Sequence, residues 1–386
     1  MKIVKIEPLF VNVSEKSNWT FFRVVTDEGL TGLGEATLQG WEEVQLACLN
    51  RLLPQLTGAT LDQAMPLITV YPHAFGGLAA NSVLSALELA IMDIRAQAAG
   101  KPVHALLGKQ LRNKVRVYAN VNRCITDRSV KGYADTAREM AGRGFTAIKI
   151  SPFDGVMPDQ LDDPAVKQAI ANGIACTYAA HEAAGPKVDV LLDCHWRFDE
   201  ESAKHVIREL APMKPFWLEC MVSESPEGQP ALARVCQYAK EHGIRLAGAE
   251  RQVAAQGFKR YVDNKLLQVV MPDIKYAGGY TEIMKICKLT AAGGIEYSPH
   301  NPTSPLCTLA SLHASAVAEN FLIFEHQLAE NERYDEVIIG ATPPLVDGCY
   351  EIPQAPGTGM QLNDEVVRAH PWRRLAPNMI RDPKLG

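Results

Sequence analysis

The segment VLLDCH, residues 190–195, ends an apolar run with two side chains that can do chemistry. Alternate residues of a β-strand share a face, so Asp193 and His195 are expected to point the same way at the end of this strand. A carboxylate can hold a metal ion, and an imidazole can exchange a proton near neutral pH. The segment therefore indicates a functional site at a strand end.

Ionisable residues stand at the ends of other short apolar segments as well. Charged groups there are costly unless they are paired, bind a metal or share a solvated mouth. Parallel strands bring their carboxyl ends to one face, where barrel proteins carry their chemistry. We therefore expect one shared site that contains Lys149, Asp193, His195, Glu219, Glu250, Asp273, His300 and Glu325.

Three of these residues, Asp193, Glu219 and Glu250, end consecutive apolar segments, so their carboxylates can meet above the strands. Three oxygen ligands without Cys or His suit Mg²⁺, which keeps open positions for substrate and water. For any one carboxylate the alternative is a helix cap or a lysine partner. Three in succession favour a site for one Mg²⁺.

The histidines are the candidate proton-transfer groups. His300 and Asp273 end neighbouring segments, and a carboxylate beside an imidazole raises its basicity and fixes its tautomer. His195 is expected across the mouth, although a single strand-end histidine is more often structural. Glu325 is either a neutral hydrogen-bond donor to a developing oxyanion or a salt-bridge partner.

The elements that must position these residues fall into three parts. Residues 1–112 contain a strand–turn–strand pattern and an amphipathic helix near 81–100, which predicts an α+β domain. Residues 113–333 alternate eight apolar strands with helices, which predicts a (β/α)8-type barrel, in its regular form or as (β/α)7β with an irregular last unit. A doubly wound sheet fits the alternation too, but no Gly-rich nucleotide loop follows a strand. Residues 334–386 are expected to pack back on the first domain.

The composition limits the class of protein. The 386 residues carry 39 Lys and Arg against 44 Asp and Glu, a net charge of −5 that offers no basic field for nucleic acid. The N-terminal segment has no long apolar run, so we expect neither a signal peptide nor a membrane span. Nine scattered cysteines without a C-x-x-C pair indicate a reduced, cytoplasmic protein.

These motifs together resemble the enolase superfamily, specifically its mandelate racemase subgroup and the acid-sugar dehydratases within it, such as galactonate dehydratase. The resemblance lies in LLDCHWRFD, FWLEC and RLAGAE for the ligand strands, in MPDIKYAGG and SPHNPTSPL for the Asp–His pair, and in FEH for the last glutamate. It implies a capping domain, one Mg²⁺, a small acid-sugar substrate and a homo-oligomer.

The departures from the subgroup pattern bear on the reaction. Racemases of this subgroup carry Lys-x-Lys on the second strand. Here Lys149 fills the first lysine position, and Ser151 stands at the second. A Lys/His racemase is therefore disfavoured, and the resemblance implies that His195 is the acid for a leaving hydroxyl. The expected reaction is loss of water from an acid sugar to give a 2-keto-3-deoxy acid. An epimerase that uses both histidines, and a non-catalytic sugar-acid binder, remain as alternatives.

Other positions are expected to shape specificity. The resemblance assigns this role to capping-domain segments around Ser14–Trp19 and Thr37–Trp41. On the first strand, Tyr118, Asn120 and Asn122 share a face and either reach substrate hydroxyls or pack inside the barrel. The LEC and GAE segments differ from the subgroup, and strand alternation places Arg251 outside the barrel mouth.

Overall fold

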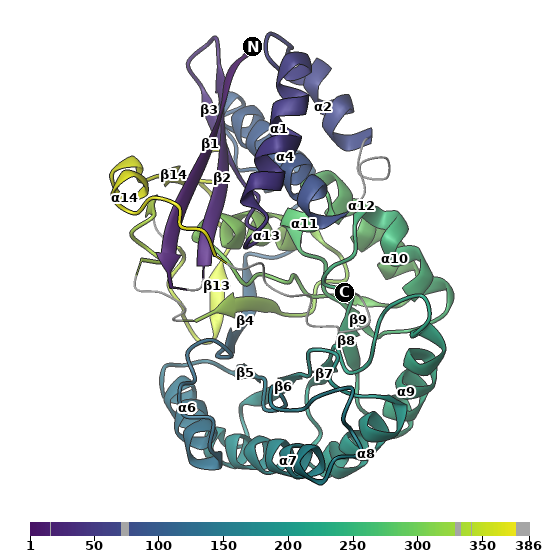
Figure 1. The fold of residues 1–386 in the computed structure, drawn as a ribbon. Helices are drawn as coiled ribbons and strands as arrows, with labels where there is room; N and C mark the ends of the chain where they lie inside the picture. Colours follow the sequence, from purple (N-terminus) through teal and green to yellow (C-terminus); the bar gives the residue numbers. More distant parts are fainter. Residues whose placement is uncertain (16, 71–76, 329–332, 341, 376–386) are drawn as a thin grey trace.

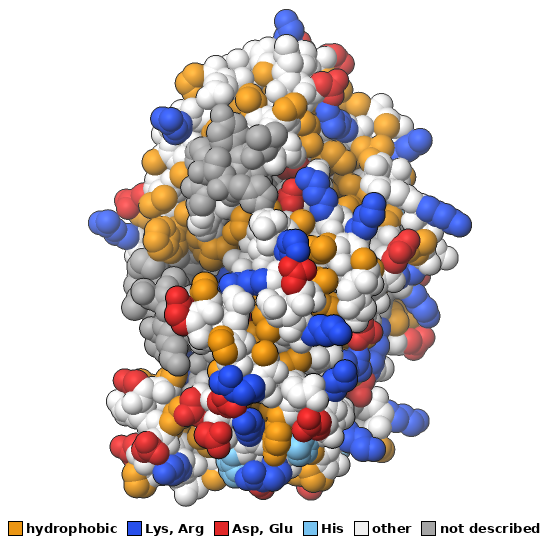
Figure 2. Space-filling model, turned by 90° about the vertical axis from the view of Figure 1, so that its right-hand side faces the viewer, with side chains coloured by type: hydrophobic (Ala, Val, Ile, Leu, Met, Phe, Trp, Pro, Cys, Tyr) orange, Lys and Arg blue, Asp and Glu red, His pale blue; other side chains and the backbone are white. Residues whose placement is uncertain are grey.

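The computed structural model describes residues 1–375 except 16, 71–76, 329–332 and 341. A small sheet with its helices lies at one end of the molecule, and a barrel of parallel strands ringed by helices lies at the other (Figure 1). The face shown in Figure 2 carries interspersed acidic and basic side chains rather than a field of one sign. Within the described residues, the helices are too short or too polar to cross a lipid bilayer.

The capping sheet is antiparallel and ordered β1 (Ile3–Ser14), β2 (Ser17–Thr26), β3 (Thr31–Glu35). Helices α1 (Glu42–Leu56), α2 (Leu61–Val70), α4 (Leu78–Ala98) and the short α5 (His104–Leu107) follow it. Helix α4 packs directly on β3: the backbones are so close that a Cβ at Gly34 would be 1.8 Å from the carbonyl oxygen of Ala86. Only glycine permits that approach.

Helix α4 also joins the cap to the barrel. Its residues Leu84 and Ile91 belong to the capping core, while Leu89 and Met92 belong to the barrel core. The Glu88 carboxylate accepts hydrogen bonds from the backbone of α12 (Gly279–Ala292), at 2.9 Å from Tyr280 N and 3.0 Å from Thr281 N. The helix thus fixes the cap over one end of the barrel.

Eight parallel strands form the barrel. The strands are β4 (Lys114–Asn120), β5 (Ala147–Ile150), β6 (Asp189–Asp193), β7 (Trp217–Glu219), β8 (Leu246–Gly248), β9 (Val269–Val270), β10 (Glu296–Tyr297) and β11 (Phe324–Gln327). Each pairs with the next from β4 to β10, and β11 pairs with β4. A parallel bridge between Tyr297 of β10 and Phe321, which precedes β11, joins the remaining two neighbours. The predicted fold class, a capping domain with an α/β barrel, is confirmed.

The barrel helices lie outside the strands, as Figure 1 shows. Several begin at residue types that commonly cap helices: Ser129 accepts from Gly132 N, Asp199 forms a capping box with Ser202, and Ser304 accepts from Leu306 N. The helices are α6 (Val130–Gly142), α7 (Pro164–Ala184), α8 (Glu200–Leu210) with η1 (Ala211–Met213), α9 (Gln229–Glu241), α10 (Ala254–Asp263), α11 (Ile274–Ala277), α12 and α13 (Pro305–Val317).

The C-terminal segment returns to the cap. β12 (Ile338–Ile339) pairs with β14 (Gln361–Leu362), β13 (Cys349–Glu351) pairs with β4, and α14 (Asp364–Ala369) follows. Val337, Leu362 and Val367 share a hydrophobic cluster with Trp19 and Phe21 of β2. The division into residues 1–112, 113–333 and 334–386, with the last part packed on the first, stays a prediction.

Candidate active site

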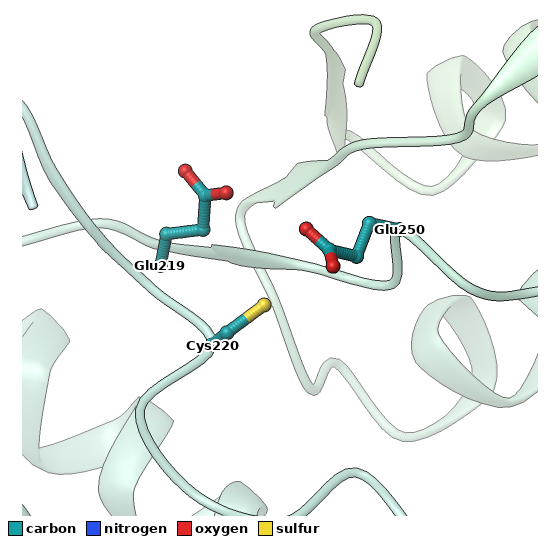
Figure 3. A group of neighbouring side chains, drawn as sticks. All are labelled: Glu219, Cys220 and Glu250. Atoms are coloured by element: carbon teal, nitrogen blue, oxygen red, sulfur yellow. The ribbon is translucent and has the colours of Figure 1, made fainter. Parts of the chain in front are cut away.

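The predicted metal ligands lie on neighbouring strand ends. Asp193 and Glu219 are paired in the register of β6 and β7. Ligand atoms of Glu219, Cys220 and Glu250 lie within 4.8 Å of one another, and Figure 3 shows the Glu250 carboxylate and the Cys220 thiol pointing toward each other. Asp193 lies beside this group, and its Oδ2 is 2.8 Å from His195 Nε2. The structure therefore brings two predicted ligands together and places the third next to them, turned to a histidine.

Glu250 reaches the mouth through an unusual turn. β8 ends at Gly248, and Ala249 follows with φ of 70°, a left-handed conformation that costs a non-glycine residue about 1–2 kcal/mol. The buried Glu224 carboxylate holds this turn by accepting from Ala249 N at 3.0 Å and from Tyr261 Oη at 2.8 Å. The GAE segment is thus not a simple extension of the strand.

This turn overturns one expectation. Strand alternation predicts that Arg251 lies outside the mouth, but in the structure Arg251 lines the central cavity. Alternation applies only while the backbone stays extended, and it stops at Ala249. The Arg251 guanidinium lies 5.1 Å from the centre of the Trp196 ring, and its Nε is 3.9 Å from Glu250 Oε1.

Lys149 forms the charged floor of the site. Its Nζ lies 2.9 Å from Glu219 Oε1 and 2.8 Å from Glu325 Oε1, and the side chain is buried. Burial alone would lower the pKa of Lys149, but attraction to the two carboxylates outweighs it and raises the pKa well above its ordinary value. Lys149 is therefore a permanent cation rather than a base.

Glu325 behaves as a salt-bridge partner in this arrangement. Its Oε1 accepts from Asn120 Nδ2 at 2.7 Å and its Oε2 from Asn301 N at 2.7 Å, in addition to the Lys149 contact. Burial raises the pKa of Glu325, but Lys149, His300 and the Asn301 N–H bring it below its ordinary value. Of the two expected roles, the contacts favour the ionised partner over the neutral donor.

The charges of the carboxylate group fit a divalent cation. Burial raises the pKa of Glu219 well above its ordinary value, although Lys149 acts in the opposite direction. Repulsion adds to this rise and comes from Asp193, Glu325 and Glu250. A dication beside these oxygens relieves that repulsion. The buried Glu219 and Glu250 are consistent with the divalent-metal site of oxygen ligands that the sequence predicts.

Cys220 is a member of this cluster that the sequence did not predict as a site residue. Its Sγ lies 3.7 Å from Glu224 Oε1, and its φ is 49°. Burial, reinforced by Glu250 and Glu224, raises the pKa of the Cys220 thiol well above its ordinary value. A neutral thiol is a poor ligand for a hard cation, so the oxygen atoms remain the candidate ligands.

His300 and Asp273 form the expected pair. His300 Nδ1 is 2.9 Å from Asp273 Oδ2, and His300 Nε2 is 3.4 Å from Glu250 Oε2. Burial lowers the pKa of His300, but the charges of Glu250 and Asp273 outweigh it and raise the pKa. Asp273 is itself held by Lys275, whose buried Nζ lies 2.7 Å from Oδ2. The imidazole therefore has a fixed orientation beside the buried carboxylates.

His195 also lies at the mouth, for a different reason from the one expected. β6 ends at Asp193, and His195 has φ of 48°, so the strand does not continue to it. The ring instead lies between two carboxylates, with Nε2 at 2.8 Å from Asp193 Oδ2 and Nδ1 at 2.9 Å from Asp154 Oδ1. Sequence reasoning missed Asp154, because it stands in a loop four residues after the end of β5.

One cavity of about 1260 Å³ connects these groups. Asp193, His195, Glu250, His300 and Lys149 line it, together with Asn120 and Asn122. Residues of both expected capping segments line it as well, among them Ser17, Trp19, Thr37 and Trp41, while Lys16 lies outside the described residues. Tyr118 takes the packing role: it is buried, and its ring meets Trp217 edge-on at 5.5 Å.

Ser151, the position of the second lysine in racemases, does not line this cavity. The side chain is fully buried, and among the described residues its Oγ has no hydrogen-bond partner. The Ser151 carbonyl accepts from Tyr133 Oη at 2.9 Å. Of the predicted proton-transfer groups, the two histidines therefore face the cavity.

Comparisons with known proteins agree with this architecture. Residues 4–108 match the mandelate racemase / muconate lactonizing enzyme N-terminal domain, and residues 132–366 match the enolase C-terminal domain-like family. The chain is 28% identical to a D-galactonate dehydratase of Pectobacterium atrosepticum over 97% of this chain and 96% of that one. It is 29% identical to a D-galactonate dehydratase of Xanthomonas campestris over 91% and 90%.

A solved structure gives the same result. The crystal structure of a mandelate racemase/muconate lactonizing enzyme from Jannaschia sp. CCS1 superimposes with a TM-score of 0.87 at 25% identity, covering 98% of this chain and 100% of that chain. The two family matches together span the cap and most of the barrel. The chain belongs to the enolase superfamily, in its mandelate racemase/muconate lactonizing enzyme subgroup.

Proposed function

We propose that this protein is a Mg²⁺-dependent dehydratase that converts an acid sugar of the aldonate type into a 2-keto-3-deoxy acid. The observation that carries the proposal is the pair of differently held histidines in one cavity. His300 is bound to Asp273, His195 is bound to Asp154 and Asp193, and the buried carboxylates lie beside them. The relatives named D-galactonate dehydratase support the substrate class.

His300 is the α-proton base in this proposal. Asp273 occupies Nδ1, so Nε2, which lies 3.4 Å from Glu250 Oε2, is the nitrogen that accepts the proton on C2 of the substrate. Lys149 places a fixed positive charge next to Glu219 and Glu325, beside the point where negative charge develops. Mg²⁺ held by Asp193, Glu219 and Glu250 would supply further electrostatic stabilisation of the enediolate. This use of a histidine base with Mg²⁺ is the general pattern of enolase-type sites.

His195 completes the reaction as the acid. It gives a proton to the 3-hydroxyl while the C3–O bond breaks, and the electron pair of that bond leaves with the oxygen as water. The electrons of the enediolate form the C2–C3 double bond. The resulting enol takes up a proton and becomes the 2-keto-3-deoxy acid.

The test is a product assay across a library of acid sugars. Purified protein with Mg²⁺ is incubated with each compound, and semicarbazide reveals any 2-keto product. The expected result is keto acid from at least one aldonate, with one D₂O-derived deuteron at C3. An epimer as the sole product, without keto acid, would overturn the proposal.

The epimerase alternative has one observation in its favour, since His195 and His300 both line the cavity. It predicts exchange of the C2 proton with inversion and without loss of water. A non-catalytic binder predicts neither exchange nor product. The same library, followed by NMR, separates the three outcomes.

A further inference from the structure

Asp154 contacts the ring nitrogen of His195 opposite the one that meets Asp193. It belongs to the loop of residues 151–163, which joins β5 to α7 at the carboxyl end of the barrel. Its Oδ1 is 2.9 Å from His195 Nδ1, while Asp193 Oδ2 is 2.8 Å from His195 Nε2. An ionised carboxylate can only accept, so Nδ1 donates to Asp154, and by the same reasoning Nε2 donates to Asp193.

Arg128 holds the Asp154 carboxylate from its other side. Arg128 Nη1 lies 3.2 Å from Asp154 Oδ2. The guanidinium is itself anchored to the backbone, because it donates to the carbonyl oxygens of Asn122 at 2.7 Å and Ser151 at 3.2 Å. Because Arg128 fixes the orientation of the Asp154 carboxylate, the carboxylate in turn fixes the orientation of the His195 imidazole.

We propose that Asp154 is a positioning residue that holds the His195 ring through Nδ1–H, so that Nε2, which lies beside Asp193, is the nitrogen presented to the leaving hydroxyl. The inference rests on the proposed function for its chemical outcome, but the ring orientation is a separate claim. The arrangement repeats, on the other histidine, the relationship between Asp273 and His300. Asp154 does not touch the reacting atoms, and it acts through His195.

A purely structural role for Asp154 is a poor explanation of the geometry. The Asp154 and Arg128 side chains are 36% and 41% exposed, and ion pairs at such exposure contribute about 0–1 kcal/mol to stability. The fold therefore gains little from this contact. Replacement of Asp154 should consequently leave the protein folded, which makes the residue accessible to a clean test.

The step that Asp154 supports is proton donation to a poor leaving group. The proton moves from His195 Nε2 to the 3-hydroxyl oxygen, the C3–O bond breaks, and water leaves with the bonding pair. Nδ1–H remains bound to Asp154 throughout. Fluoride at C3 leaves without needing a proton, so elimination of fluoride bypasses His195 while it still uses His300.

The kinetic test compares three reactions of the Mg²⁺-loaded protein. They are dehydration of the best acid sugar, deuterium exchange at its C2, and fluoride release from its 3-deoxy-3-fluoro analogue. Asp154→Asn and Asp154→Ala should lower dehydration roughly 10- to 100-fold, the range seen when the partner of a functional histidine is removed. Exchange and fluoride release should change less than about threefold, which is well below that range. Asp159→Asn, an exposed aspartate of the same loop, is the matched control and should leave all three rates unchanged.

A spectroscopic arm tests the ring orientation without turnover. In ¹⁵N-histidine-labelled, Mg²⁺-loaded protein, the His195 signals are identified by their loss in His195→Asn. Nδ1 should carry a proton in the wild type and in Asp159→Asn. In Asp154→Ala, Nδ1 loses its carboxylate partner, so the Nδ1 signal should move away from its wild-type position.

The outcomes separate the two claims. Equal loss of dehydration, exchange and fluoride release in Asp154→Asn would overturn the positioning role, and so would unchanged dehydration. An unchanged His195 spectrum in Asp154→Ala would overturn it as well. Absence of keto acid from wild-type protein with every acid sugar would instead refute the proposed function, and the spectrum alone would then decide the role of Asp154.

Discussion

The His300 imidazole and the Asp273 carboxylate form a buried hydrogen-bonded pair, with Nδ1 and Oδ2 2.9 Å apart. The two residues come from the ends of neighbouring strands, 27 positions apart in the chain. The pair does not stand alone, because Lys275 Nζ contacts both oxygens of the same carboxylate, at 2.9 Å and 2.7 Å. The orientation of the candidate base therefore depends on a buried ion pair.

Loss of the Lys275 charge should destabilise the fold. Lys275→Met leaves the buried Asp273 carboxylate without its cation, which typically costs about 3–5 kcal/mol. Urea unfolding should show this loss in the free energy of unfolding. Lys259→Met is the control: that lysine is 53% exposed and pairs with Asp263 at the surface, so its loss should cost less than about 0.5 kcal/mol. Equal stability of the two variants would contradict the role of Lys275.

The two histidines should separate the two halves of the reaction. His300→Asn should abolish deuterium exchange at C2 and dehydration together, because the base is lost. His195→Asn should retain exchange while dehydration falls about 10²- to 10⁴-fold, the usual effect of removing a general acid. NMR of substrate in D₂O and the keto-acid assay measure the two rates. Parallel loss of both activities in both variants would contradict separate roles.

Metal binding should be visible as a gain in stability. A ligand that binds only the folded state adds about 2.7 kcal/mol at a concentration of 100 Kd, so Mg²⁺ should raise the Tm of the wild type. Asp193→Asn, Glu219→Gln and Glu250→Gln should each remove most of this rise, because each deletes one anionic ligand. Glu182→Gln, an exposed change on α7, should keep it. A Tm that does not respond to Mg²⁺ in the wild type would refute the metal site.

Stability should fall in mild acid because of a buried histidine pair outside the site. His104 Nδ1 and His313 Nδ1 lie 3.1 Å apart, and burial lowers the pKa of His313 to about 3, helped by the nearby His104. Below the ordinary pKa of about 6.5, His313 binds a proton in the unfolded chain but not in the folded protein. The contribution of His313 to the free energy of unfolding is therefore complete above pH 6.5 and is lost as the pH falls toward 3.

The loss amounts to about 1.4 kcal/mol for each pH unit, or about 2 kcal/mol between pH 7 and pH 5. His313→Gln should show a correspondingly flatter dependence of the unfolding free energy on pH. His205→Gln, whose side chain is 46% exposed, should keep the wild-type slope. Identical slopes for wild type and His313→Gln would show that His313 does not titrate on unfolding.

Much of the site could be predicted from local patterns in the sequence. The apolar segments are strands because they are short and bounded by turns, and parallel strands in a barrel must bring their carboxyl ends to one face. Lys149 and Glu219 lie at or next to the carboxyl ends of β5 and β7, as the sequence predicts, whereas Asp273 follows β9 as the cap of α11 and Glu325 lies within β11. The charge chemistry of these residues then follows from their types alone.

Local pattern failed where the backbone leaves the strand. His195, Cys220 and Ala249 all have positive φ, and a two-residue alternation has no meaning beyond such a turn. For this reason Arg251 lines the cavity against expectation, and His195 reaches the mouth by a route that alternation does not describe.

The sequence by itself determined the fold class, the order of the strand-end residues and the family, because periodicity, residue type and motif spacing are local properties. Only the tertiary structure decided which partner each side chain has. Asp154 meets His195 across 41 positions, and Lys149 meets Glu219 across 70. Such contacts form when the barrel closes and loops from different strands pack together, so they cannot be predicted from the periodicity of the sequence.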